Sequence, residues 1–224
     1  MIFEIEMICN SLLCVGALFG FVYSLIKFFK PKKALYNKMV GCALGCMFIE
    51  RLYRIVQFFV AGGIPLGFQI GAFGTIGCYM FLFTANYGSM DSLIDDGSAE
   101  LKKYRRIALA APLTALVAAT AMLFMAAPIE RRITCAIEEL FVGASAYYSL
   151  KHLIIPTKFA DFLSGMRPFH IISLIMAAGT TLECIIMCDL SDIQALWCIS
   201  SALLLIALLS LAPVLERGTK QWRT

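Results

Sequence analysis

Charged residues are scarce in this sequence. They make up 15% of the chain, against 60% for hydrophobic residues, and the mean hydropathy is +0.82. Soluble domains carry about 25% charged residues, so this composition excludes an ordinary soluble enzyme or binding module. It predicts an integral membrane protein of the all-α class.

The residues and motifs of several catalytic classes are also missing. There are only two histidines, His152 and His170, at predicted membrane edges, which is too few for an intramembrane zinc hydrolase. The nine cysteines are scattered and no pair has the spacing of a metal knuckle. No G-x-S-x-G elbow or phosphate-binding glycine loop occurs, and residues 193–214 lack the lysine that retinal needs. We expect no enzymatic activity, no metal and no cofactor.

Long apolar runs are what the sequence does contain, and seven of them reach the roughly 20 residues that a membrane span needs. They cover about 7–29, 38–60, 66–87, 107–127, 133–155, 169–188 and 193–214. The first run is long and follows the acidic MIFEIE, which argues against a cleaved signal peptide. We predict a single seven-helix transmembrane domain over residues 1–224.

The basic residues predict an orientation, because Lys and Arg are retained on the cytoplasmic side of a membrane. With seven spans, nearly all of them fall at one set of loops, and the opposite set holds only Arg131 and Arg132. We predict an outside N-terminus and a cytoplasmic C-terminus in the cell membrane. The net charge of +4 is then a topology signal. We expect contacts with anionic lipid headgroups and none with nucleic acid.

A short internal similarity bears on the architecture. YSLIKFFKPKK (23–33) aligns with YSLKHLIIPTK (148–158), and both end a span of the same predicted direction. This indicates two parallel halves, about 1–90 and 133–216, joined by a linker helix at 107–127. In helix count and in this patch the arrangement resembles the small sugar transporters and their proline-glutamine-loop relatives. The proline-glutamine pair itself is absent, because Lys32 follows Pro31 and Thr157 follows Pro156.

Ionisable residues interrupt the second, fifth and sixth runs. Glu50, Arg54 and Gln57 share one helical face, and Arg51 lies about 100° from Glu50. A charge in mid-bilayer costs about 2.5–3.5 kcal/mol even on the mildest scales, so we predict that these groups converge inside the bundle, in its outer half. The candidate ligand-binding residues are Glu50, Arg51, Arg54, Gln57, Gln69, Glu138, Glu139 and Glu183.

The charges of this set allow two interpretations. Glu50 and Arg54 can pair along their helix while Arg51 pairs with Glu138 or Glu183, which gives a purely structural network. Four carboxylates against two arginines leave an excess of two, and an excess carboxylate in a low-dielectric site must protonate, bind a cation or meet water. That excess favours a functional cavity.

Two functions from different classes are compatible with these features. The first is a small transporter or permease that binds a cation, a proton or a cationic polar solute in the outer cavity. The alternative is a seven-helix sensor or receptor-like subunit with an outward-facing pocket and a separate cytoplasmic protein partner. Below Glu50 the second run, NKMVGCALGCM, offers few polar groups, and no matching inner site is evident. A transporter requires polar residues that continue from the outer cavity to the cytoplasmic face, whereas a sensor does not.

Overall fold

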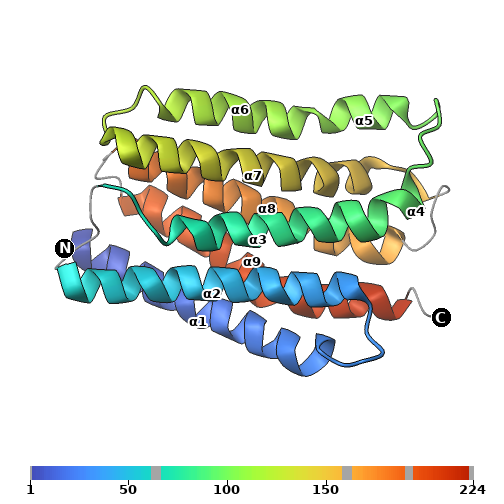
Figure 1. Ribbon diagram of the computed structural model, residues 1–224, viewed down its shortest axis with the longest axis horizontal. Helices are drawn as coiled ribbons and strands as arrows, with labels where there is room; N and C mark the ends of the chain where they lie inside the picture. Colours follow the sequence, from blue (N-terminus) through green and yellow to red (C-terminus); the bar gives the residue numbers. More distant parts are fainter. Residues whose placement is uncertain (1, 62–66, 158–162, 190–193, 222–224) are drawn as a thin grey trace.

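The computed structural model describes residues 2–61, 67–157, 163–189 and 194–221, and the chain is all-α in these ranges. The long helices lie along the longest axis of the molecule and alternate in direction along the chain (Figure 1). They are α1 (Ile2–Phe28), α2 (Leu35–Ala61), α7 (Ile129–Ile154), α8 (Leu163–Asp189) and α9 (Gln194–Gln221).

The third and fourth predicted spans are built from shorter helices. The third consists of α3 (Ala72–Ala85), the π-helical turn η1 (Asn86–Asp91) and α4 (Ser92–Ile94). The fourth consists of α5 (Lys102–Ala108) and α6 (Ala110–Met122). Pro112 has no N–H to donate to the carbonyl of Ala108, which accounts for the interruption between α5 and α6.

Four segments are long and apolar enough to cross a membrane. They are Ile5–Phe28, Lys102–Met122, Leu163–Asp189 and Gln194–Lys220. These segments indicate a multi-pass membrane protein. Helices α2 and α7 fall outside this set and carry most of the buried ionisable residues, while α3 is only 14 residues long. Seven spans and their orientation stay a prediction.

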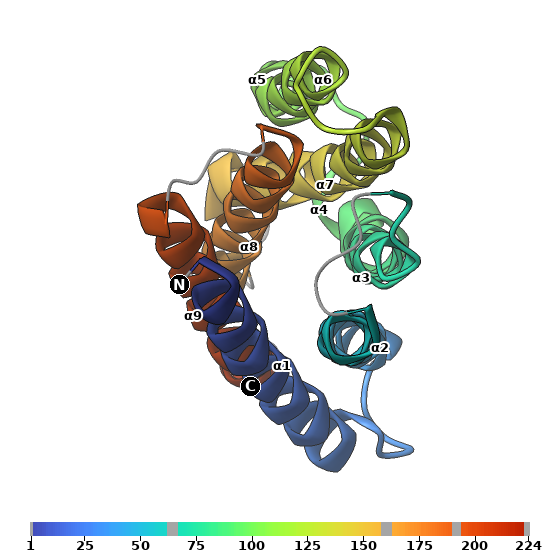
Figure 2. The same ribbon diagram turned by 90° about the vertical axis from the view of Figure 1, so that its left-hand side faces the viewer.

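Six helices form a ring in the order α1, α2, α3, α7, α8, α9, and α9 returns to α1 (Figure 2). Helices α5 and α6 lie outside this ring, against α7. Helices α2 and α8 therefore occupy opposite positions. Helices α1, α2 and α3 form one triplet of the ring and α7, α8 and α9 form the other, with α5 and α6 at the periphery. The predicted three-one-three repeat is not tested by this geometry.

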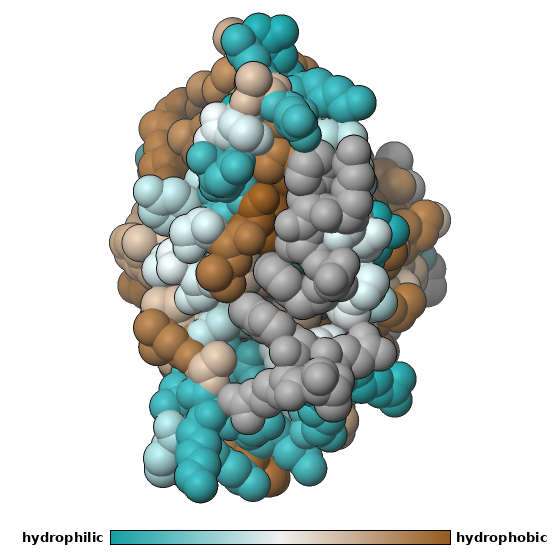
Figure 3. All heavy atoms as spheres, turned by 90° about the vertical axis from the view of Figure 1, so that its right-hand side faces the viewer, coloured by the Kyte–Doolittle hydropathy of each residue, from teal (hydrophilic) through white to brown (hydrophobic). Residues whose placement is uncertain are grey.

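The C-terminal end of α2, the N-terminal end of α7 and the C-terminal end of α8 lie at one end of the ring, which we call the outer end, and the opposite end is the inner end. The N-terminal end of α1 is at the outer end, and the C-terminal end of α9 is at the inner end (Figure 1). Figure 3 looks onto the inner end and shows hydrophilic residues at two of its edges, with apolar residues on the flanks. Large apolar side chains on the flanks are exposed, among them Val15, Phe59, Val117 and Phe124, as expected for surfaces that face lipid.

Close helix packing positions the charged residues. A Cβ atom on Gly74 of α3 would lie 2.5 Å from Glu50 Cβ and 2.8 Å from the Cys46 carbonyl oxygen of α2. Only glycine permits this approach, and small residues are the usual means by which membrane helices come together. Helix α3 thus packs directly against the part of α2 that carries Glu50.

Candidate functional site

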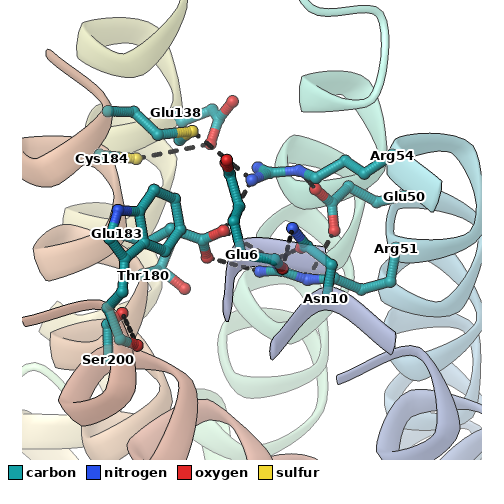
Figure 4. Close-up of polar contacts among 12 residues, drawn as sticks. Glu6, Asn10, Glu50, Arg51, Arg54, Glu138, Thr180, Glu183, Cys184 and Ser200 are labelled. Atoms are coloured by element: carbon teal, nitrogen blue, oxygen red, sulfur yellow. Dashed lines mark hydrogen bonds and ion pairs between the residues drawn. The ribbon is translucent and has the colours of Figure 1, made fainter. Parts of the chain in front are cut away.

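An ion-pair network crosses the outer half of the ring (Figure 4). Arg51 of α2 donates from its two terminal nitrogens to the two oxygens of Glu183 on α8, both at 2.6 Å. Arg54 donates to Glu183 Oε1, also at 2.6 Å. Both arginines also pair with Glu50, Arg51 through Nε at 2.8 Å and Arg54 through its own Nε. We call Glu50, Arg51, Arg54 and Glu183 the outer cluster.

The outer cluster is neutral and closed to solvent. Its two arginines balance its two glutamates, and the four residues are between 1% and 3% exposed. Asn10 of α1 accepts a further hydrogen bond from Arg51 at 3.2 Å, so three helices of the ring meet here. The opposite charges therefore balance within the buried network. This is the arrangement expected if the charged residues form a purely structural network. The convergence predicted for these four residues is confirmed.

Glu138 of α7 lies beside the outer cluster but is not part of its ion pairs. Its side chain is 2% exposed, and the hydrogen bond that it accepts comes from the Cys184 thiol at 3.6 Å. Figure 4 shows Glu138 and Glu6 directed toward the tip of Arg54. Among the described residues, Glu138 forms no ion pair within 4.0 Å. The carboxylate excess predicted from the sequence is therefore centred on Glu138.

Three other predicted residues are not in this network. Glu139 is about 100° from Glu138 on α7 and accepts hydrogen bonds from the Thr181 hydroxyl at 2.8 and 3.0 Å. It lines a cavity between α6, α7 and α8. Gln57 is half-buried and forms no side-chain hydrogen bond to the outer cluster, and the amide nitrogen of Gln69 is buried without a hydrogen-bond partner among the described residues. The expected convergence therefore does not include Glu139, because adjacent residues on a helix face different directions.

A second polar cluster lies at the inner end, where none was expected. Lys151 of α7 pairs with Asp91 at 2.5 Å and with Asp95 at 2.8 Å. Asp95 also pairs with Arg105 at 2.6 Å, and His152 hydrogen-bonds to Asp91 at 3.1 Å. We call Asp91, Asp95, Arg105, Lys151 and His152 the inner cluster.

The two histidines are buried near the inner end of the ring. His152 and His170 are both 0% exposed, and their ring centroids are 5.1 Å apart. Neither ring nitrogen of His170 has a hydrogen-bond partner, and the same holds for Nδ1 of His152. Buried polar atoms of this kind are usually satisfied by protein or by ordered water, so the pair defines a polar region between the inner cluster and the ring interior.

The acidic side chains of the inner cluster are held ionised by their neighbours. Burial opposes ionisation of Asp91, but hydrogen bonds from His152 and Lys151 outweigh it and lower the pKa of this carboxyl group. Burial also opposes ionisation of Asp95. Hydrogen bonds from Lys151 and from the Gly97 backbone N–H outweigh this effect and lower the pKa of Asp95. The inner cluster is a set of charge pairs at neutral pH.

Buried polar side chains lie between the two clusters. On α7, Glu138, Ser145, Ser149 and His152 are spaced by seven, four and three residues, which places them on one helical face. All four are buried. The hydroxyl groups of Tyr79 on α3 and of Thr180 on α8, about one helical turn from Glu183, are 2.7 Å apart.

The inner half of this line contains unsatisfied polar atoms. Ser149 Oγ and Ser173 Oγ are buried without hydrogen-bond partners. Toward the inner end, Tyr36 of α2 donates to Asn86 Oδ1 at 3.0 Å, while the Asn86 amide nitrogen has no partner. The second run alone suggested an apolar inner half; helices α3, α7 and α8 supply the polar groups that it lacks. The spacing from Glu138 to His152 was a sequence signal for this path.

Comparisons with models of protein families, with curated proteins and with solved structures find no match.

Proposed function

We propose that this protein is a small membrane transporter that moves protons, or a small cation in their place, through the interior of the ring. The observation that carries this proposal is Glu138, a buried carboxyl group beside two arginines whose charges are already balanced by other carboxylates. A carboxyl group without a cation of its own in such a site must hold a proton or bind a cation. Glu138 is therefore the proposed binding group.

The polar line on α3, α7 and α8 supports movement beyond Glu138. From Glu183 to His170 it follows roughly 20 Å of α8, with the Tyr79–Thr180 hydroxyl pair between these ends. Hydroxyl groups, imidazoles and ordered water all exchange protons, and intramembrane chains of such groups mark ion and proton pathways. The unpartnered Ser149, Ser173 and His170 atoms are the places where water would complete the path.

Both ends of this path are closed, which favours alternating access over an open channel. At the outer end, the bonds between Glu183 and the two arginines join opposite helices of the ring. At the inner end, the Tyr36 ring lies against Phe169 with centroids 5.8 Å apart, again between α2 and α8. Rocking of the two triplets would separate these contacts in turn, as in transporters built from repeated halves.

Proton flux into sealed vesicles tests the proposal. Purified protein would be reconstituted into vesicles that contain a pH-sensitive dye, and a potassium gradient with valinomycin would drive proton entry. We expect wild-type flux above that of protein-free vesicles, and loss of this excess in Glu138→Gln. Glu100→Gln, which alters an exposed loop residue, is the matched control and should keep the wild-type rate.

The result that overturns the proposal is wild-type flux equal to that of protein-free vesicles, both with protons and with sodium or potassium as the test ion. Size-exclusion profiles would show that Glu138→Gln is folded. Absence of flux, combined with binding of a polar solute that depends on Glu138, would favour the alternative of a membrane sensor.

A further inference from the structure

A cavity of about 420 Å³ lies on the flank of the ring, between α6, α7 and α8. Its size is within the range of small-molecule sites. Thr114 of α6 and Ala178 of α8 are exposed side chains at the cavity, so it can be reached from the surface that faces lipid. This cavity is separate from the outer cluster, whose four residues are not among those that line it.

Small residues create this space. Ala111, Ala115, Gly143, Ala146, Ala177 and Ala178 line it, together with larger apolar side chains. A Cβ atom on Gly143 of α7 would lie 2.5 Å from the Ala115 Cβ of α6. The glycine thus brings α6 against α7 at this level, while the neighbouring alanines leave the volume beside it unfilled.

Glu139 is the one charged residue that lines this cavity. The residue is 1% exposed, and its two carboxyl oxygens share the single hydroxyl hydrogen of Thr181. No described cation lies within ion-pair distance of it. A carboxylate can accept about four hydrogen bonds, so most of its acceptor capacity is available to a molecule in the cavity.

We propose that this cavity is a binding site for a primary amine that carries an apolar chain, with the ammonium group on Glu139 and the chain along the alanine-lined wall. The ammonium group supplies the missing positive charge and the hydrogen-bond donors. The chain buries apolar surface that the cavity walls would otherwise present to lipid or water. The site goes beyond the proposed transport path, because it lies outside the ring interior.

The ammonium group can come from a membrane lipid such as a phosphatidylethanolamine or from a free lipophilic amine. Both sources are tested with one probe, a long-chain primary amine that carries a photoreactive diazirine, added to protein in phosphatidylglycerol nanodiscs. The matched neutral probe is the alcohol of the same chain. We expect the amine to label peptides of α6 and α8 at the cavity about tenfold more than the alcohol does, as expected for one charge-assisted hydrogen bond.

Variants at the cavity separate charge from volume. Glu139→Gln should remove the preference for the amine while leaving alcohol labelling unchanged. Ala178→Leu should reduce labelling by both probes, because the larger side chain occupies the cavity. Ala121→Leu, an exposed position on α6 outside the cavity, is the matched control and should label as the wild type does.

Competition then assigns the source. Loss of labelling when phosphatidylethanolamine replaces phosphatidylglycerol identifies a lipid headgroup, whereas loss only with a soluble alkylamine identifies a free amine. Equal labelling by amine and alcohol in the wild type, or an amine preference that survives Glu139→Gln, would overturn the proposal. Neither result depends on proton flux, so this site and the transport path can fail separately.

Discussion

Arg51 on α2 and Glu183 on α8 form a two-point pair across the ring, with both nitrogen–oxygen distances at 2.6 Å. Two parallel bonds fix the guanidinium plane as well as its position. Because α2 and α8 are opposite helices of the ring, this pair sets the width of its outer end.

Removal of the Glu183 charge should destabilise the fold strongly. In Glu183→Gln, the two buried arginines keep only Glu50 as a partner within ion-pair distance among the described residues, and breaking a buried pair in this way costs about 3–5 kcal/mol. We expect a clear fall in the thermal unfolding midpoint in detergent micelles, measured by circular dichroism. Glu100→Gln should stay within about 0.5 kcal/mol of the wild type. An unfolding midpoint of Glu183→Gln equal to that of the wild type would contradict the ion-pair geometry.

Gly74→Ala should separate α3 from α2. The added methyl group meets the Glu50 Cβ and the Cys46 carbonyl oxygen, and backbone atoms cannot move aside as a flexible side chain can. Overpacking of this kind costs typically 1–3 kcal/mol, and we expect this loss in thermal unfolding. Gly88→Ala is the matched control, since its Cβ atom meets nothing within 4 Å. Equal unfolding midpoints for the two variants would show that the α2–α3 contact is looser.

Tyr79→Phe tests the middle of the polar line. It removes the hydroxyl group that contacts Thr180 at 2.7 Å, and the loss of one buried hydrogen bond costs about 1 kcal/mol. We expect modest destabilisation together with a several-fold decrease in proton flux in reconstituted vesicles. Tyr53→Phe, at a half-buried position on α2, should keep the flux. Unchanged flux in Tyr79→Phe would place the pathway elsewhere in the ring.

Acid should weaken the inner cluster. The pKa of Asp95 is lowered in the folded protein, so the unfolded chain, with an aspartate pKa of about 3.9, takes up the proton first. The stability that Asp95 contributes is present above about pH 4 and is lost as the pH falls through the lowered pKa. The unfolding midpoint of the wild type should therefore fall more steeply below pH 4 than that of Asp95→Asn. Parallel curves would contradict the ion pairs with Lys151 and Arg105.

Much of the architecture followed from hydrophobic run length. The predicted spans coincide with helical segments, and the intramembrane cost of charge correctly predicted that Glu50, Arg51, Arg54 and Glu183 meet. Helical periodicity could also have separated Glu138 from Glu139, since adjacent residues are 100° apart. Predicted depth alone placed them in one layer and missed this difference in direction.

The inner cluster was harder to predict from sequence. Asp91 and Asp95 are in an irregular segment between two predicted spans, and its π-helical turn carries no clear hydrophobic period. Their partner Lys151 is some 60 residues away in the chain, near the end of α7. Only the packing of α3 beside α7 brings these charges together, and one sequence carries no signal for that long-range pairing.

The order of helices around the ring leaves two boundaries between the triplets, one where α1 meets α9 and one where α3 meets α7. The Lys151–Asp91 pair fastens the second boundary at the inner end, whereas α5 and α6 are attached to α7 and α8 alone in their main contacts. A hinge motion between the two triplets would therefore move α5 and α6 together with the C-terminal triplet. Opening of the boundary between α3 and α7 would break the Lys151–Asp91 ion pair.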